Sequence, residues 1–270
     1  MKKTILTQKA FEAARGFIET EARPLEMARF RQHFQGASPE PVLDALRKYR
    51  NANGGFEHAL EPDLRCDESS ALCTSIAFQI LRSTDVHPDD SLVSAGMAYF
   101  LKTLDRARGH WRIIPRSSER SPHAPWWNQA GREDMFDSFS PNPTAEILGY
   151  LYDWQQHVPS EPIALVSDRV IGSLPDLGKM EMHELLCCLR LLETRNLPDG
   201  DRLRIHRKLT ELVEATVSWD PARWEGYGLG PLGGVWSWPA GCGARSGLSI
   251  SGGARNVRGR PSRLRNLHTE

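Results

Sequence analysis

The chain has 270 residues, of which 40% are hydrophobic and 25% charged, a composition typical of a globular protein with a sizeable core. Its 34 Lys and Arg residues balance 34 Asp and Glu residues, so the formal net charge is zero. This balance argues against a protein that binds nucleic acid along a basic surface. No apolar run approaches the roughly 20 residues that span a bilayer, so no transmembrane segment is expected.

The N-terminus and the cysteines favour a cytoplasmic protein. Met1–Leu6 begins like a signal peptide, but Gln8, Lys9 and Glu12 interrupt the apolar segment that would have to follow. The five cysteines are an odd number without the spacing of a disulfide framework or of a zinc site. We therefore expect reduced thiols in a reducing compartment.

Apolar residues recur at helical spacing through most of the chain, and sustained strand-like alternation is absent. Prolines and capping residues mark several helix starts. Helices are expected over Phe11–Ile18, Ile163–Leu174, Met180–Leu192 and Arg202–Trp219. Between the first two of these ranges, further helices are expected to begin at Pro24, at Ser38, at Ser69 or Ser70, at Asp89 or Asp90, and at Asn142. The predicted fold class is all-α.

A turn between two of these helices carries an unusual density of ionisable groups. Asn53-Gly54-Gly55 is a strong turn signal, and Phe56 is an apolar anchor directly after it. The turn is followed by four ionisable side chains, which are Glu57, His58, Glu61 and Asp63. Crowded carboxylates beside a histidine can share a proton or bind a cation. The alternative is that Glu61 and Asp63 cap the next helix and that Glu57 is solvated.

The pattern of helix, glycine-aromatic turn, loop and helix occurs twice. The first turn is Gly54-Gly55-Phe56, and the second is Gly109-His110-Trp111, followed by a much longer loop. Repeated helical hairpins bury their apolar faces against their neighbours, so a closed ring or a stacked array of hairpins is expected.

Several motifs resemble those of a known superfamily. Asn51–Phe56 followed by Thr74–Phe78 resembles the repeat of the terpenoid cyclase and protein prenyltransferase superfamily. The runs Ala22–Phe30, Gly54–Asp63 and Pro122–Trp127 resemble a bacterial group of toroid proteins often called prenyltransferase-like. The resemblance spans about residues 15–232. It implies an α/α toroid, in which inner helices surround a central cavity.

The chain departs from the reaction motifs of that superfamily. The Asp-x-Asp-Asp acid motif is missing, and Asp63–Asp67 is the nearest string. Asp89-Asp90 does not continue into Asp-Asp-x-x-Asp, which typically serves diphosphate ionisation. His58, Asp63 and Cys66 are zinc-binding types at the wrong spacing. The resemblance therefore implies the fold better than the reaction. No metal site is predicted, and Mg²⁺ is expected only if a diphosphate is bound.

The long second loop contains the run Pro122-His-Ala-Pro-Trp-Trp127, in which prolines stiffen the backbone and two tryptophans offer large flat surfaces. Trp126 and Trp127 are candidates for an aromatic wall beside an apolar or carbocationic ligand, with His123 close by. The alternative is a loop pinned in place by tryptophan packing.

Two further polar positions have structural interpretations that we prefer. Glu146 lies close to the position of a capping-box carboxylate, although it could instead point into the cavity as an acid or base. His183 and Glu184 are expected on a helix surface or as satisfied core residues. Arg65, Arg112 and Arg116 could bind an anion, but scattered arginines are usually solvated.

The C-terminal part changes character. Trp224 and Tyr227 lie in a further glycine-aromatic connector and are candidates for closing the cavity wall. From Gly233 the chain is rich in Gly, Arg and Ser. We expect one toroid domain over residues 1–232 and a poorly ordered tail over residues 233–270. A frame-shifted or truncated end is one hypothesis for this tail, and a natural basic tail is the other.

The preferred function is binding of, or catalysis on, an isoprenoid or similarly apolar ligand in the central cavity. His58, Glu61 and Asp63 would supply acid/base or cation-binding chemistry. The residues expected to line the ligand site are Phe56, His123, Trp126, Trp127, Glu146, Trp224 and Tyr227. The alternatives are a carbohydrate-active α/α barrel that uses paired carboxylates and a non-catalytic scaffold or binding module.

Overall fold

A computed structural model describes residues 6–87 and 89–217. Within these residues the regular structure is helical, with isolated bridges and no extended strand, which confirms the all-α class. The α-helices are α1 (Gln8–Glu21), α2 (Pro24–Gln35), α3 (Glu40–Arg47), α4 (Ala71–Ser83), α5 (Ser91–Thr103), α6 (Glu133–Asp137), α7 (Pro141–Asp153), α8 (Ser160–Ser173), α9 (Met182–Leu192) and α10 (Asp199–Thr216). In the part of the chain described, no helix is long and apolar enough to cross a membrane.

The helix starts show which capping predictions hold. The side chains of Ser70 and Asp90 accept backbone N–H groups at the starts of α4 and α5, as expected. The expected cap at Ser38 is wrong. The N-cap residue of α3 is Pro39, whose backbone angles are already helical, and no side chain makes a capping hydrogen bond there. Asn142 is not a cap either, because the Ser140 hydroxyl accepts the N–H of Asn142 at 3.0 Å.

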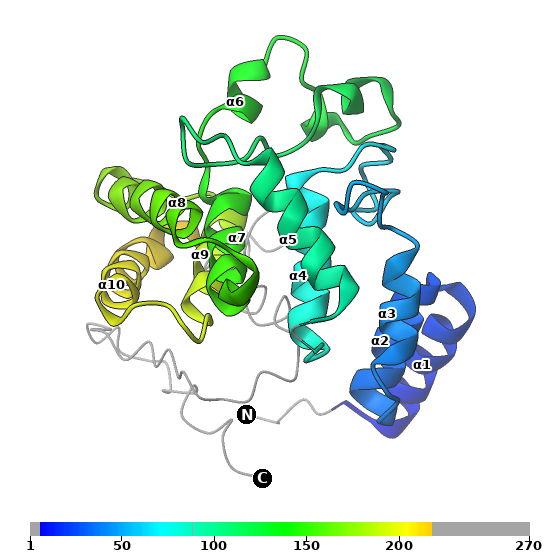
Figure 1. The fold of residues 1–270 in the computed structure, drawn as a ribbon. Helices are drawn as coiled ribbons and strands as arrows, with labels where there is room; N and C mark the ends of the chain where they lie inside the picture. Colours follow the sequence, from blue (N-terminus) through cyan, green and yellow to red (C-terminus); the bar gives the residue numbers. More distant parts are fainter. Residues whose placement is uncertain (1–5, 88, 218–270) are drawn as a thin grey trace, which may run out of the picture.

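The helices after the first connector form two rows (Figure 1). α7 packs against α4 on one side and α9 on the other, and this row is covered by α5, α8 and α10. The three helices of the first row run in the same direction. Phe78 and then Arg82 of α4 meet Tyr150 and then Asp153 of α7. Ser140 and then Glu146, at the start and in the middle of α7, meet Glu184 and then Arg190 of α9. The helices α1, α2 and α3 group at one side of these rows.

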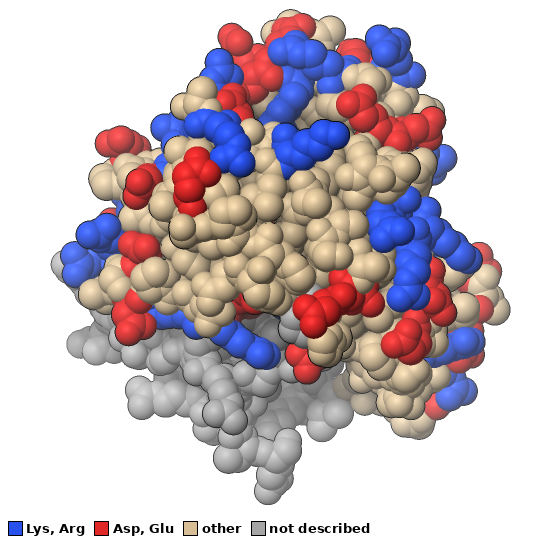
Figure 2. Space-filling model, in the orientation of Figure 1, with Lys and Arg blue, Asp and Glu red and all other residues tan. Residues whose placement is uncertain are grey.

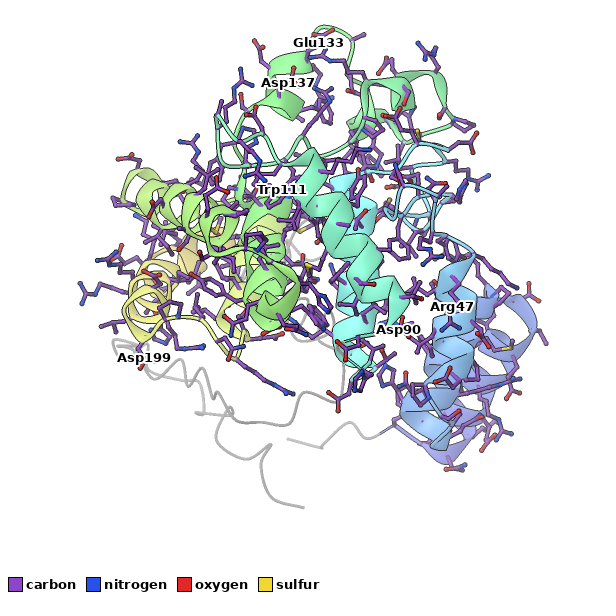
Figure 3. The ribbon with its side chains drawn as sticks, viewed as in Figure 1. Arg47, Asp90, Trp111, Glu133, Asp137 and Asp199 are labelled. Carbon is purple, nitrogen blue, oxygen red and sulfur yellow. The ribbon has the colours of Figure 1, made fainter. Side chains whose placement is uncertain are left out.

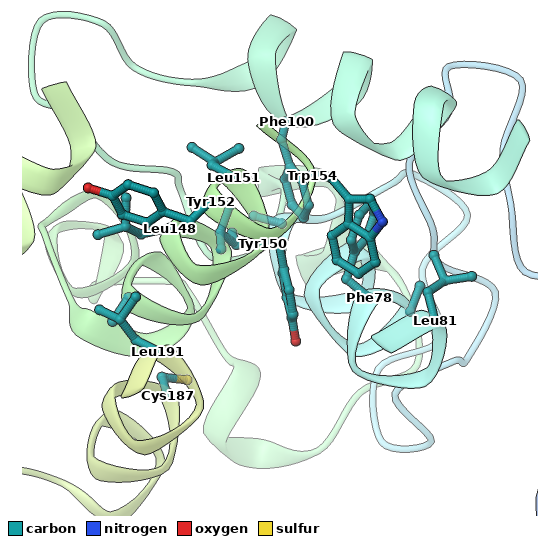
Figure 4. Close-up of a cluster of buried hydrophobic side chains, with 14 of the residues drawn as sticks. Phe78, Leu81, Phe100, Leu148, Tyr150, Leu151, Tyr152, Trp154, Cys187 and Leu191 are labelled. Carbon is teal, nitrogen blue, oxygen red and sulfur yellow. The ribbon is translucent and has the colours of Figure 1, made fainter. Parts of the chain in front are cut away.

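Aromatic side chains fill the space between α4, α5 and α7 (Figure 4). The Phe78 ring lies 5.2 Å from Phe100, 5.4 Å from Tyr150 and 5.3 Å from Trp154, measured between centroids. Gly96 lets α5 approach this cluster, since a Cβ atom there would lie 2.4 Å from the Phe78 ring. Close packing of large rings therefore fixes how α5 lies on α4.

The long second loop, residues 112–139, is ordered and has its own small core. We call it the tryptophan loop. Ile114 and Phe136 pack with Leu64 and Cys66 of the first connector, and Trp127 covers this cluster. Asp137 lies at the end of α6 (Figure 3). It pairs with Arg112 and with Arg116. Two of the three arginines that could bind an anion are thus engaged in holding the loop together.

Charged side chains are distributed unevenly over the face seen in Figure 2. They gather toward the edges and over the tryptophan loop, and a broad area without charges crosses the middle of the face. At one edge, Arg47 of α3 lies 3.8 Å from Asp90 at the start of α5, a pair marked in Figure 3. Exposed pairs of this kind are worth about 1 kcal/mol or less, so they orient helices without determining the fold.

Candidate functional site

Residues 57–67, which we call the acidic connector, lie directly against the tryptophan loop. The N–H of Arg65 donates to the carbonyl of Pro122 at 3.0 Å, and the N–H of Ala124 donates to the carbonyl of Asp63 at 2.9 Å. Leu64 and His123 pair in an isolated antiparallel bridge. Two segments that the sequence singled out separately therefore form one continuous surface.

The Asp63 carboxylate joins the two segments through their side chains. Its two oxygens accept the indole N–H groups of Trp126 at 2.9 Å and of Trp127 at 2.8 Å. Trp127 is half-buried, whereas Trp126 is 53% exposed and presents its ring to solvent. With both oxygens occupied, Asp63 positions the aromatic surface, and this geometry does not favour the acid/base role expected for it.

Glu61 is the member of the acidic connector that best fits acid/base chemistry. Burial raises the pKa of its carboxyl from 4.5 to about 7, and the neighbouring Asp63 acts in the same direction. Arg23 and His183 act in the opposite direction. A carboxyl group that titrates near neutral pH can donate or accept a proton under ordinary conditions.

Glu57 is buried, so the alternative of a solvated side chain at this position is wrong. The Ser70 hydroxyl donates to one of its carboxylate oxygens at 2.7 Å, and the Cys73 thiol donates to the other at 3.1 Å. Burial raises the pKa of the Glu57 carboxyl from 4.5 to about 7. Its place directly after the core residue Phe56 was the sequence signal that could have indicated this burial.

His58 lies at the exposed edge of the connector in a strained backbone. Its Nε2 lies 2.7 Å from Oδ1 of Asn51, and its Nδ1 lies 3.6 Å from a carboxylate oxygen of Asp67. His58 and Ala59 have φ angles of 63° and 61°, in the left-handed region that non-glycine residues rarely adopt. Arg23 stabilises this turn by donating to the carbonyl of Ala59 at 2.5 Å.

Two residues expected to line the ligand site have structural roles. Phe56 is fully buried in the main core, and its N–H donates to the Thr74 hydroxyl at 3.0 Å. It cannot reach a ligand at the surface of the connector. His123 shapes the tryptophan loop, because its two ring nitrogens lie 2.6 Å from the carbonyl of Ser121 and 2.8 Å from Oδ1 of Asn128.

Glu146 belongs to a buried ion pair, so the preferred capping-box interpretation is wrong. The Tyr150 hydroxyl donates to one carboxylate oxygen, and Arg190 Nη1 lies 3.1 Å from the other. The Cys187 thiol also donates to it, at 3.4 Å. The carboxylate is fully engaged between α7 and α9, which favours a structural role over one toward a ligand.

His183 and Glu184 lie in the first turn of α9, which agrees with a helix-surface interpretation. Glu181 caps the helix with its side chain, and the Glu184 carboxylate accepts the backbone N–H of Glu181 at 3.0 Å. Together these two hydrogen bonds form a capping box. The Nδ1 atom of His183 lies 3.1 Å from the Glu181 carboxylate. This contact raises the pKa of the His183 imidazole.

The structure describes only some of the remaining sequence candidates. Trp224, Tyr227 and the tail over residues 233–270 lie outside the described residues. Cys66, Cys73, Cys187 and Cys188 are buried free thiols. Among the residues with described positions, no group of three or more His, Cys, Asp or Glu is placed to share a metal ion.

A shallow groove of about 510 Å³ lies on another part of the surface, between α8 and the start of α9. Its walls include Phe139, Asp168, Arg169, Asp176 and Glu184. None of the residues expected to carry the function lines it. Searches against protein families, curated proteins and solved structures found no match to this chain.

Proposed function

We propose that the protein binds an apolar, isoprenoid-like ligand against Trp126. The observation that carries this proposal is the Asp63 carboxylate, which holds the indole N–H groups of both tryptophans and leaves Trp126 53% exposed. A large aromatic ring that is fixed at the surface loses little conformational freedom when a ligand covers it. The Trp126 ring therefore offers apolar contact area that is already oriented.

We further propose that the two helical rows are part of an α/α toroid. The parallel row of α4, α7 and α9, with α5, α8 and α10 on its outer side, is the arrangement that repeated helical hairpins produce. The glycine-aromatic connectors and the resemblance to the terpenoid cyclase and prenyltransferase superfamily support the same interpretation. In such a ring, the acidic connector and the tryptophan loop would form part of one mouth.

Glu61 would act as the proton donor or acceptor at this mouth, because its pKa of about 7 lies near the working pH. A magnesium-bound diphosphate does not fit the described residues well. Both oxygens of Asp63 accept indole N–H groups, and the Cys66 sulfur is buried against the tryptophan loop. We therefore assign no step to a metal ion.

A second candidate ligand is an oligosaccharide. Tryptophan faces stack on sugar rings, and the site contains two carboxyl groups, Glu57 and Glu61, whose pKa values are both raised to about 7. Paired carboxyl groups carry out most glycosidic cleavage. Against this, Glu57 is fully buried under Ser70 and Cys73, which leaves it no path to a sugar.

The test is calorimetric titration of the full chain with geraniol, and in parallel with maltohexaose or cellohexaose. We expect geraniol to bind, and Trp126→Ala to weaken its binding at least tenfold. Met135→Ala is the matched control, because Met135 lies in the same loop and is 52% exposed. Binding of a sugar without binding of geraniol would select the second candidate. Binding of neither would indicate a scaffold and overturn both proposals.

A further inference from the structure

We propose that α1 is the surface through which two copies of this chain associate, with their α1 helices packed antiparallel. The proposed ligand site does not use this surface, so the two proposals stand or fall separately. α1 lies at one edge of the molecule (Figure 1) and packs mainly against α2. Although α1 has 14 residues, none of them is buried.

Large apolar side chains are exposed on and beside α1. Among the described residues, the three most exposed are Leu6 (68%), next to the N-cap of α1, Phe17 (65%) in α1 and Phe34 (61%) in α2. The Phe34 ring lies 6.0 Å from the Phe11 ring between centroids, so α2 adds an exposed ring beside α1. Exposed apolar side chains gathered in one part of a molecule mark a surface for association.

The exposed face of α1 is apolar along most of the helix. Residues at the spacing i, i+3, i+4 and i+7 lie on one face of a helix. At this spacing α1 has Ala10, Ala13, Ala14 and Phe17, all of them exposed. Phe11 lies on a different face and stacks on Phe30 of α2. α1 therefore has one apolar face on α2 and a second that no described part of the chain buries.

This second face is complementary to itself when two helices run antiparallel. A two-fold axis between Ala13 and Ala14 brings Phe17 of each copy opposite Ala10 of the other, because these positions are equally far from the axis in sequence. The large ring then lies over a small side chain, and the alanines at the centre let the two backbones approach closely. Such a pair uses the same patch on both copies, as most dimers do.

The charges of α1 favour the antiparallel direction. Lys9 lies in the first turn, whereas Glu19 and Glu21 lie in the last turn, which has no basic residue. This order opposes the helix dipole, whose positive end is at the N-terminus. An antiparallel second copy places its acidic end beside Lys9 and its basic end beside Glu19 and Glu21. An unfavourable order within one chain thus becomes complementary between two.

The contact is small, which sets the expected affinity. A helix of 14 residues is about 21 Å long. Two such faces bury less than the roughly 1,600 Å² of a standard protein interface. We therefore expect a weak dimer that forms in the micromolar range of concentration.

The test is sedimentation velocity of the full chain from about 1 µM to about 200 µM, a range that brackets a weak dimer. We expect the average mass to rise toward that of a dimer. Ala13→Glu should weaken dimerisation at least tenfold, because the two-fold axis would bring two new carboxylates together in the contact. Ala13 is exposed in the single chain, so the circular dichroism spectrum should not change. The control is Gln8→Glu, on the polar face with Glu12, which should change dimerisation less than twofold.

A charge exchange tests the direction of the helices. Lys9→Glu makes both ends of α1 acidic, and Glu19→Lys combined with Glu21→Lys makes both ends basic. Each of these proteins alone should dimerise at least threefold more weakly than the wild type. An equal mixture of the two should recover dimerisation, because an acidic helix then meets a basic one.

Three results would contradict the inference. A wild type that stays monomeric over the whole concentration range would overturn it, and so would a dimer that Ala13→Glu does not weaken. A mixture of the charge variants that fails to recover would overturn the antiparallel arrangement. A monomeric wild type that cosediments with phosphatidylglycerol vesicles would assign the face of α1 to a membrane surface instead.

Discussion

Asp63 holds two indole groups with one carboxylate, so a change that keeps its size and removes its charge isolates this interaction. In Asp63→Asn one oxygen can still accept an indole N–H, but the amide nitrogen faces the other indole donor. We expect the loss of one charge-assisted hydrogen bond, worth about 1–2 kcal/mol of unfolding free energy. Acrylamide should also quench the tryptophan fluorescence more strongly, because Trp126 is released.

The control for this change is Asp134→Asn, which removes an exposed carboxylate from the same loop. It should alter neither the urea midpoint nor the quenching constant beyond error. Equal quenching in the Asp63 variant and in the wild type would show that packing alone holds Trp126. The positioning role of Asp63 would then be lost, and the aromatic surface would need another explanation.

At this scale the sequence indicated the right segments but not the role of each side chain. The density of ionisable groups pointed correctly to the acidic connector, and the Trp126-Trp127 pair pointed to the loop that contacts it. Which carboxylate is buried depends on partners far along the chain. Glu57 follows the core residue Phe56, but the groups that enclose its carboxylate, Ser70 and Cys73 at the start of the next helix, lie 13 and 16 positions along the chain.

At the scale of elements, helices with clear periodicity were predicted near their observed positions. The short helix α6 was missed, because five residues carry too little periodicity to be recognised. The start of α7 was placed at Asn142, whereas the helix begins at Pro141, with Ser140 as its side-chain cap and a break in the helical angles at Asn142 (φ −93°, ψ 115°). Both residue types cap helices well, so composition alone could not choose between them.

Two glycines in helices allow a matched test of how elements approach each other. In Gly96→Ala the new Cβ would lie 2.4 Å from the Phe78 ring, so α5 has to move away from α4. We expect overpacking to lower the unfolding free energy by about 1–3 kcal/mol. Gly16→Ala, in α1, places a Cβ where no atom lies within 4 Å. It should raise stability by about 0.5–1 kcal/mol through helix propensity.

Urea unfolding of the two variants measures these opposite effects with the same substitution. If Gly96→Ala were as stable as the wild type, the close approach of α5 to Phe78 would not be required for the packing of these helices. A loss of stability in Gly16→Ala would mean that a contact to α1 is missing from the described structure.

At the scale of the whole molecule, a polar network joins the helices of the parallel row. Arg82 of α4 reaches Asp153 of α7 at 2.5 Å, and its Nη1 atom donates to the carbonyl of Arg190 in α9 at 3.0 Å. Glu146 of α7 and Arg190 of α9 form a further ion pair in the same row. These contacts join residues that are up to 108 positions apart. Periodicity could predict the helices but not this arrangement.

The pH dependence of stability is the whole-molecule property that the buried carboxyl groups control. Burial raises the pKa of Glu57 in the folded protein from 4.5 to about 7, so between these pH values the folded state binds the proton more tightly than the unfolded state. The stabilising contribution of the protonated group is complete below about pH 4.5 and is lost as pH rises through about 7. Glu61 acts in the same sense.

Glu57→Gln removes one of these titrating groups and keeps its shape. The wild type should lose about 1–2 kcal/mol more unfolding free energy than the variant between pH 5 and pH 8, a fraction of the roughly 3 kcal/mol that corresponds to the whole pKa shift from 4.5 to about 7. Urea unfolding at pH 5, 6, 7 and 8 measures the difference between the two curves, and Glu214→Gln controls for loss of an exposed carboxylate. Parallel curves for Glu57→Gln and wild type would mean that Glu57 stays ionised in the folded protein. Its hydrogen bonds from Ser70 and Cys73 would then outweigh its burial.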